Sequence, residues 1–376
     1  MIGEQQLVEL RRHLHQNPET AFQEKGTQKK VIEVLEGFNP VKIWKVAGTG
    51  ILVQCTGDIG AAGHLYRTDF DALPIQEDNP DLSYQSVNKG VAHLCGHDGH
   101  TAIAVGLCSS VISNGINEPI YVLFQPAEET GMGMLEVLKD ETFNSIEFKS
   151  ATAIHNLPSF ELGTILTNHN TFSAAVSTLV FRFKGLCSHA AEPWNGKNPN
   201  AAISKLSSWL DDNNVFPKPN DFAFGTVVCV RVGDTAYGTN PGNGEIHITI
   251  RAANNQLFES FKNALKQKAE ELAREEDLDI TCEELEIFPA TGAHEVLLTQ
   301  LESQAQHIDL KMSRLPGPNT WGEDFGYLSP LFPTLMFGVG SGKNQKPLHN
   351  PGYNFPDEII YPTIKLLTNY FKELHV

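Results

Sequence analysis

Residues 174–185 read AAVSTLVFRFKG, and the texture of the chain changes at this stretch. Its long alternation of apolar and polar residues predicts a β-strand. The residues that follow predict a helix, two strands and a charged amphipathic helix, in the segments 198–212, 224–232, 244–252 and 257–277. We assign to this region the β-α-β-β-α-β order of a ferredoxin-like sandwich, an α+β fold.

Helices and buried strands alternate on both sides of this region. Before it, the chain predicts strands at 50–55, 64–70, 119–125, 150–156 and 162–168, with a buried helix over 100–113. After it, a buried strand over 333–340 precedes a helix over 358–374. This alternation favours an α/β/α domain with a mixed central sheet. We therefore predict an α/β fold whose first domain, 1–172 and 287–376, is interrupted by the α+β domain, 173–286.

Composition excludes several classes of protein. The chain has 376 residues and a formal net charge of −17, without a lysine-rich or arginine-rich patch, so we expect no nucleic-acid partner. No apolar run reaches the roughly 18 residues that span a membrane, and the first residues lack the apolar region of a signal peptide. We expect a cytoplasmic protein without a membrane partner. Its six scattered cysteines predict no disulfide framework.

One loop carries an unusual density of reactive side chains. Residues 93–100 read HLCGHDGH, which fits a thiol nucleophile beside its base, a metal site or a histidine-rich polar loop. Cys95 and His97 occupy alternate positions, which on an extended loop point the same way, and a thiolate with an imidazole suits zinc. By the same parity Asp98 and His100 face the other way, in hydrogen bonding around the ligands or in helix capping.

Further candidate ligands follow the carboxyl ends of predicted strands, where functional side chains of open α/β sheets gather. Glu128 and Glu129 follow the strand 119–125, His155 lies in the strand 150–156, and His349 comes after the strand 333–340. A lone histidine or a glutamate pair is usually a surface or satisfied core feature. Their joint occurrence at one edge of the sheet is what favours a site.

Eight segments together resemble signatures of a known family. They read LRRHLHQNPETAFQE, RTDFDALPIQE, GVAHLCGHDGHTA, QPAEET, AIHNLP, KGLCSHAAEPWNGKNP, WGEDFG and LHNPGYNFPDE, in this order, between about residues 10 and 357. The chain is similar to the metallo-amidohydrolases of the aminoacylase and zinc carboxypeptidase superfamily, in the subgroup of N-acyl-amino-acid amidohydrolases, hippurate hydrolases and auxin-conjugate hydrolases. The resemblance implies a metal-binding α/β domain interrupted by a smaller lid domain.

The resemblance also implies roles for individual residues. Two divalent metal ions, zinc or manganese with cobalt or nickel as alternatives, would be bound with Cys95 as the bridge, and His93 is an alternative ligand. Glu128 would be the general base, and Asp71, with Asp69 as a further candidate, would orient a ligand. The implied metal ligands are Cys95, His97, Glu129, His155 and His349.

In the lid, the resemblance implies that His189 stabilises the tetrahedral oxyanion, within its own subunit or across a homodimer formed through the lid. Where the family commonly has Asn-x-Ile-Pro, this chain reads AYGTNPGNGEIHITIR, residues 236–251, so Asn240 is the candidate for the substrate-binding asparagine. Arg251 either binds a substrate carboxylate with a two-pronged contact or forms a surface ion pair.

The predicted activity is hydrolysis of the amide bond of an N-acyl amino acid, which releases a carboxylic acid and a free amino acid. A dipeptidase or carboxypeptidase would share this chemistry and differ in substrate. Two alternatives come from other classes. A thiol hydrolase with Cys95 as nucleophile would have no use for Glu129 or His349, and a non-catalytic metal-binding protein would not need Glu128.

Overall fold

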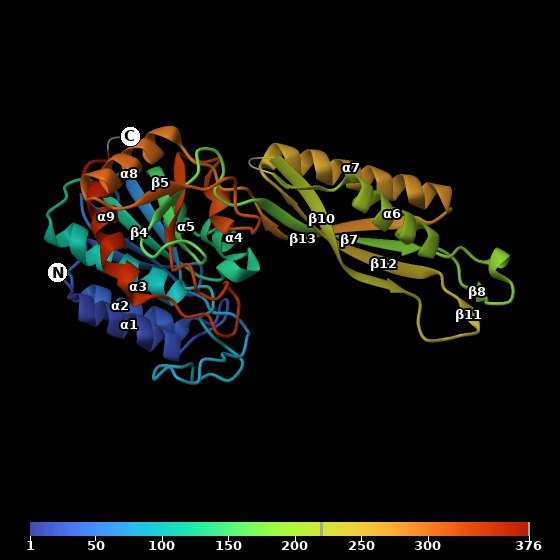
Figure 1. Ribbon diagram of the computed structural model, residues 1–376, viewed down its shortest axis with the longest axis horizontal. Helices are drawn as coiled ribbons and strands as arrows, with labels where there is room; N and C mark the ends of the chain where they lie inside the picture. Colours follow the sequence, from blue (N-terminus) through green and yellow to red (C-terminus); the bar gives the residue numbers. More distant parts are fainter. Residues whose placement is uncertain (219–220, 375–376) are drawn as a thin grey trace. The chain divides into compact units, whose positions relative to one another are not determined.

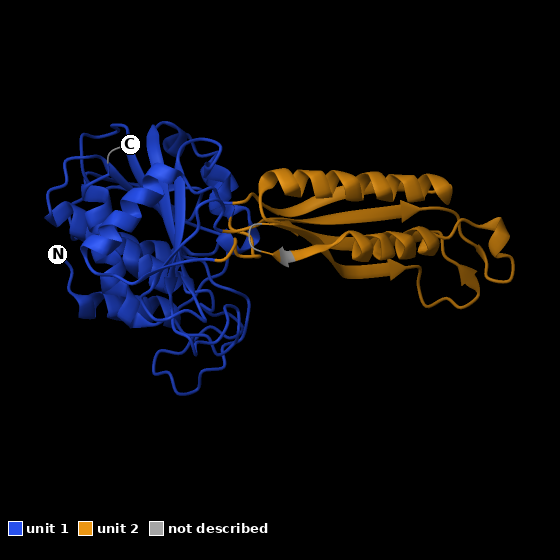
Figure 2. Cartoon of the chain, turned by 45° about the horizontal axis from the view of Figure 1, so that its top comes forward, with its two compact units in different colours: residues 1–172, 291–315, 324–376 blue, residues 173–290, 316–323 orange. Residues whose placement is uncertain are grey.

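The computed structural model describes residues 1–218 and 221–374 and divides into two compact units (Figures 1 and 2). The first unit comprises Met1–Phe172, Thr291–Leu315 and Asp324–Val376, and the second comprises Ser173–Ala290 and Pro316–Glu323. The short piece Pro316–Glu323 groups with the second unit because Asn319 accepts a backbone hydrogen bond from Ala174 at 2.9 Å.

The first unit is built on one mixed sheet of eight strands in the order β1-β2-β4-β3-β5-β15-β6-β14. Pairs β3/β4, β3/β5, β5/β15 and β6/β14 are parallel, and the pairs β1/β2, β2/β4 and β6/β15 are antiparallel. The mixed α/β fold is therefore confirmed. The strands are β1 Lys42–Val46, β2 Gly50–Gln54, β3 Gly63–Asp69, β4 Ile120–Gln125, β5 Phe148–Leu157, β6 Ile165–Thr167, β14 Met312–Arg314 and β15 Thr334–Gly340.

Helix α3, His97–Ser113, is the central helix of this unit. It packs against α1, α2 and α9 and against strands β3 and β4 (Figure 1). Nearly every residue of α3 is buried, and the helix is predominantly apolar beyond its polar first turn. The other helices of the unit are α1 Glu4–Gln16, α2 Lys25–Glu36, α4 Gly133–Val137, α5 Glu141–Asn144, α8 Glu295–His307 and α9 Ile360–Lys372.

The second unit is an antiparallel sheet with two long helices, α6 Asn200–Asn213 and α7 Asn255–Glu275 (Figure 2). Its strand order is β13-β7-β12-β10-β9. In chain order the four long strands β7, β10, β12 and β13 are the first to the fourth, so they lie in the order 4-1-3-2 of a ferredoxin-like sandwich. That prediction is confirmed. The strands are β7 Ala175–Lys184, β9 Val215–Lys218, β10 Asp221–Val232, β12 Asn243–Ala252 and β13 Asp279–Phe288.

The apolar stripes of α6 and α7 form the core of this unit with one face of the sheet. Leu206 and Leu265 from the helices pack in one buried cluster with Ile246, Ile248 and Ile250 of β12. Strand β13 continues to Phe288, two residues beyond the predicted end of the domain. A separate two-stranded ladder pairs β8, Ser188–His189, with β11, Thr239–Asn240.

None of the helices within residues 1–218 and 221–374 is both long enough and apolar enough to cross a bilayer.

Candidate metal centre

Four neighbouring strands of the first unit bring the candidate ligands to one edge of the sheet. In the order β4-β3-β5-β15 each strand runs parallel to its neighbour, so their carboxyl ends lie together. Asp71 follows β3, Glu128 and Glu129 follow β4, His155 lies near the end of β5, and His349 follows β15. This is the edge at which open α/β sheets place their sites.

The loop that carries Cys95 turns sharply at Gly96, where φ is +98°. A Cβ atom added at Gly96 would lie 2.5 Å from Oδ1 of Asn156, so the position requires glycine. Helix α3 begins at His97 rather than at His100, and the prediction of an extended loop with alternating directions is wrong there. His97 and His100 instead share one helix face, with stacked rings whose centroids lie 5.5 Å apart.

The five predicted ligands lie close enough to share metal ions. Cys95 Sγ lies 3.6 Å from His155 Nε2. Glu129 places Oε1 at 3.8 Å from His97 Nε2 and Oε2 at 3.6 Å from His349 Nε2. In the groups Cys95–His97–His155 and Cys95–Glu129–His349, all donor atoms lie within 4.8 Å of one another. Cys95 belongs to both groups.

Two of the donor atoms also lack a hydrogen-bond partner, which is a second reason to expect a cation between them. His97 Nε2 and Glu129 Oε1 are buried, and within residues 1–218 and 221–374 neither has a hydrogen-bond partner. Such groups are costly unless a ligand satisfies them. The backbone N–H of His349 donates to Leu94 O at 2.8 Å, which ties the last ligand to the Cys95 loop.

Burial favours the protonated, neutral forms of the acidic candidate ligands when no cation is bound. Burial raises the pKa of Glu129 to about 7; His97 opposes this effect, and the nearby carboxylates of Asp71 and Asp69 add to it. Burial, together with Glu129, raises the pKa of the Cys95 thiol well above its usual value. Bound cations favour the deprotonated forms of both groups, so this donor set suits metal and little else.

Asp71 orients two of the candidate ligands at once. Its Oδ1 accepts a hydrogen bond from His97 Nδ1 at 3.2 Å, and its Oδ2 accepts one from the backbone N–H of Glu129 at 3.1 Å. His155 donates from Nδ1 to Asn156 O at 2.8 Å, which leaves its Nε2 toward Cys95. Carboxylates and carbonyls that bind the second imidazole nitrogen fix the ring for metal binding.

A buried charge network lies beside the ligands, and sequence reasoning found only part of it. Asp69 accepts from His100 Nδ1 and from Arg67 Nη1, both at 2.7 Å, while Arg67 Nη2 donates to Asp324 at 2.8 Å. Burial would raise the pKa of Asp69, but His97, His100 and Arg67 hold it well below its usual value. Arg67 and Asp324 could have been singled out from the sequence, because they lie in the motif segments RTDFD and WGEDFG.

Asp98 and His93 both lie near His15 of α1. Asp98 accepts a hydrogen bond from His15 Nδ1 at 2.9 Å and pairs with Arg11 at 3.3 Å, so it fixes the first turn of α3 on α1. His93 is buried, and burial lowers its pKa to about 4. Its ring lies 6.5 Å from that of His15.

The residues predicted for the lid lie in the second unit. His189 is an exposed residue of β8, and its Nδ1 accepts from the Ala191 N–H at 3.0 Å. Asn240 is buried in β11, where it donates to Ser188 Oγ at 3.1 Å and accepts from Asn198. Arg251 donates from Nη1 to Thr320 O at 3.0 Å.

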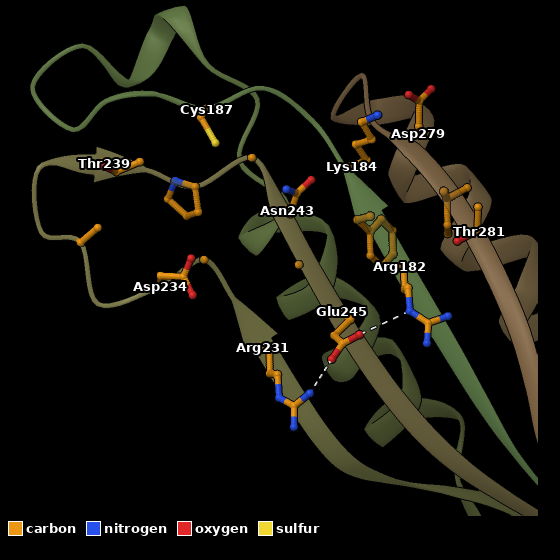
Figure 3. Close-up of a pocket in the computed structure, with 17 residues that line it drawn as sticks. Arg182, Lys184, Cys187, Arg231, Asp234, Thr239, Asn243, Glu245, Asp279 and Thr281 are labelled. Atoms are coloured by element: carbon orange, nitrogen blue, oxygen red, sulfur yellow. Dashed lines mark hydrogen bonds and ion pairs between the residues drawn. The ribbon is translucent and has the colours of Figure 1, made fainter.

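A cavity of about 570 Å³ in the second unit contains none of the candidate ligands (Figure 3). Its charged lining is balanced, because Glu245 pairs with Arg231 at 3.0 Å and with Arg182 at 3.5 Å. Glu245 also belongs to a donor group with Cys229 and His247. The two arginines occupy its carboxylate, so we place no metal there.

Comparison with known proteins identifies the family. The model of peptidase family M20/M25/M40 matches residues 65–373. The chain belongs to this family. An N-acetyldiaminopimelate deacetylase of Anoxybacillus flavithermus is 31% identical over 373 residues, 96% of each chain. One of Lactobacillus helveticus is 29% identical and covers 95% of this chain and 94% of its own.

A solved structure of the M20 family supports the fold. A Bacillus subtilis protein, described as a dinuclear metal-binding peptidase of that family, has a TM-score of 0.85 at 24% identity, over 98% of this chain and 97% of its own. Membership of the M20/M25/M40 family, together with these deacetylase relatives, makes the chain a metal-dependent amidohydrolase.

Proposed function

We propose that the chain hydrolyses the amide bond of N-acyl amino acids and releases a carboxylic acid and a free amino acid. The observation that carries the proposal is the position of Glu129, whose two carboxylate oxygens face His97 on one side and His349 on the other. The similarity to N-acetyldiaminopimelate deacetylases supports an acetyl group on the acyl side and a dicarboxylic diamino acid on the other.

Two divalent ions, zinc or manganese with cobalt and nickel as alternatives, fit the donor set. One group is Cys95, His97 and His155, and the other is Cys95, Glu129 and His349, so the shared thiolate is the candidate bridge. When bound, the ions polarise the amide carbonyl and lower the pKa of water toward neutrality. Cysteine favours zinc within this set.

We assign proton transfer to Glu128. It is 7% exposed in the short helix η1, Glu128–Thr130, and its carboxylate lies within 4.8 Å of the donor atoms of His97 and Glu129. A carboxylate at this distance takes a proton from the attacking water and delivers it to the leaving amine.

The second unit supplies the remaining proposed groups. We assign oxyanion stabilisation to His189, whose imidazole is exposed on β8, and assembly as a homodimer through this unit. Asn240 holds Ser188, the neighbour of His189, and so fixes the ladder that presents the imidazole. Arg251 uses one guanidinium nitrogen for Thr320, and its other N–H groups suit a substrate carboxylate.

The alternative of a thiol hydrolase is disfavoured by the environment of Cys95. A nucleophilic cysteine needs a lowered pKa, whereas burial and Glu129 raise the pKa of this thiol. A dipeptidase keeps every step above and changes only the acyl side of the amide, which becomes an aminoacyl group, while an amino acid still leaves as the amine.

The experiment that tests the proposal is a substrate screen on metal-loaded protein, over N-acetyl, N-benzoyl and indole-acyl amino acids and dipeptides. We expect turnover that a chelator abolishes and added divalent metal restores. Glu128→Gln should lower turnover by roughly two to four orders of magnitude with both metals retained, because an amide does not accept the proton of water. Full activity in chelated, metal-free protein would refute the proposal.

A further inference from the structure

Glu24 is a fully buried carboxylate outside the ligand set. It precedes α2, and both of its oxygens accept hydrogen bonds from distant parts of the chain. Oε2 accepts from Thr49 Oγ1 at 2.6 Å, in the turn between β1 and β2, and Oε1 accepts from the backbone N–H of Ala127 at 2.9 Å. The second bond reaches the turn that carries Glu128 and Glu129.

That turn holds an unusual backbone conformation. Ala127 has φ +53° and ψ +39°, in the left-handed region, and it is the residue directly before Glu128. For a residue other than glycine this conformation costs roughly 1–2 kcal/mol, so neighbouring contacts must maintain it. Its carbonyl accepts from Thr130 Oγ1 at 3.0 Å and from the Gly133 N–H at 3.2 Å, and its N–H is held by Glu24.

The turn is thus held by carboxylates at both ends. Glu24 binds the N–H of Ala127, and Asp71 binds the N–H of Glu129, on the two sides of Glu128. Asp71 also contacts His97, so that end of the turn is coupled to the metal ligands. At the other end, the second hydrogen bond of Glu24 goes to Thr49, which is not a candidate ligand.

We propose that Glu24 is a positioning residue for Glu128: it fixes the left-handed turn at Ala127 and so aims the proton-transferring carboxylate. This inference rests on the proposed function for its kinetic consequence. Since Asp71 anchors Glu129 independently, removing the Glu24 side chain should misplace Glu128 and leave metal binding intact. A misplacement of about 1 Å lowers turnover by up to about 100-fold.

Three variants separate positioning from simple support of the fold. Glu24→Ala leaves the Ala127 N–H and the Thr49 hydroxyl without their partner. Glu24→Gln keeps an oxygen for Ala127 and offers an N–H group to Thr49, so it should retain most of the activity. The matched control is Glu19→Gln, since Glu19 lies in the same segment but its carboxylate accepts from the N–H groups of Gly26 and Thr27, at the start of α2.

The experiment measures kcat, KM, metal content and hydrogen exchange on the full-length, metal-loaded protein. For Glu24→Ala we expect kcat to fall about 10- to 100-fold with KM and metal content unchanged, and faster exchange in a peptide that contains residues 127–131. Glu24→Gln and Glu19→Gln should both stay near wild type. Equal losses in Glu24→Ala and Glu24→Gln, or loss of metal in Glu24→Ala, would overturn the proposal.

Hydrogen exchange tests the role of Glu24 independently of the proposed function. If wild-type protein cleaves none of the amides in the screen, the proposed function fails, while the exchange of residues 127–131 still reports whether Glu24 holds the turn. Unchanged exchange in Glu24→Ala would overturn the inference even in an active enzyme.

Discussion

At the scale of single residues, the candidate metal centre is a set of side chains whose protonation states depend on one another. Cys95 and the mostly buried Glu129 are acids whose pKa values are raised, and His155 has a pKa that burial and His100 lower well below its usual value. A neutral imidazole and deprotonated anions are the forms that bind metal. We therefore expect metal affinity to depend on each of these side chains.

Cys95→Ser should weaken metal retention, and activity should fall in proportion to metal occupancy, because a hydroxyl is a much poorer ligand than a thiolate. Metal content per chain after dialysis measures the effect. Cys282→Ser is the control, since Cys282 is an exposed residue of β13 in the second unit. An inactive Cys95→Ser variant that retains its full metal content would instead indicate a nucleophilic cysteine.

The ligands could be predicted from the sequence, whereas several of their partners could not. Cys95, His97 and His349 are unusual residue types in motif segments, so their chemistry is visible without a structure. The roles of Glu24 and Asn156 depend on contacts across 103 and 56 residues of chain, to Ala127 and His100. No local pattern encodes such distances, and a glutamate before a helix reads as an ordinary cap.

At the scale of elements, the start of α3 decides where the ligands point. The sequence favoured an extended loop up to His100, where the predicted helix begins. In the structure the helix starts three residues earlier, immediately after the left-handed Gly96. The side-chain directions therefore follow a helical period rather than a period of two.

Gly96→Ala should destabilise the protein and weaken metal retention. The left-handed conformation costs roughly 1–2 kcal/mol for alanine, and the new Cβ also meets Asn156 at 2.5 Å. Gly115→Ala is a matched control at the other end of α3, where φ is +60° and an added Cβ has nothing within 4 Å. Thermal unfolding and metal content should both separate the two variants, and equal behaviour would contradict the role of the Asn156 contact.

The contact of α1 with α3 should make stability depend on pH. His15 donates to Asp98 and to Glu77 at 3.1 Å, and although burial lowers its pKa, these two carboxylates raise it above its usual value. A raised folded-state pKa stabilises the protein fully below the unfolded pKa of about 6.5, and the stabilisation is lost as pH rises through the folded pKa.

Urea unfolding of wild type and His15→Gln, at pH values on both sides of the folded pKa, measures this contribution. The difference in unfolding free energy between the two proteins should be largest at the acidic end and shrink as pH rises. A difference that grows with pH would show that His15 is neutral in the folded state.

At the scale of the whole molecule, the candidate functional residues are distributed over two units with separate cores. The first unit holds every candidate metal ligand, and the second holds His189. The sequence predicted both folds because their strand and helix patterns differ, a nearly continuous apolar pattern against an alternating one. The piece Pro316–Glu323 escaped prediction, since its assignment depends on a contact with Ala174 far along the chain.

His189→Ala should lower turnover with little change in metal content, because the proposed role concerns the oxyanion and not the ions. Loss of metal would make His189 a ligand. Mixing His189→Ala with Glu128→Gln tests the homodimer. Recovery of activity in the mixture assigns His189 to the partner's site, since one site of each mixed dimer is then complete, and no recovery assigns it to its own subunit.

The position of β15 between β5 and β6 has a consequence for synthesis on the ribosome. Both β5 and β6 precede the second unit in the chain, whereas β15 follows it. During synthesis β5 therefore lacks its neighbour β15 until the second unit has emerged. Unpaired edges invite association between chains. Because His349 follows β15, a chain that ends before β15 lacks both this strand and one candidate ligand, and we expect it to retain metal poorly.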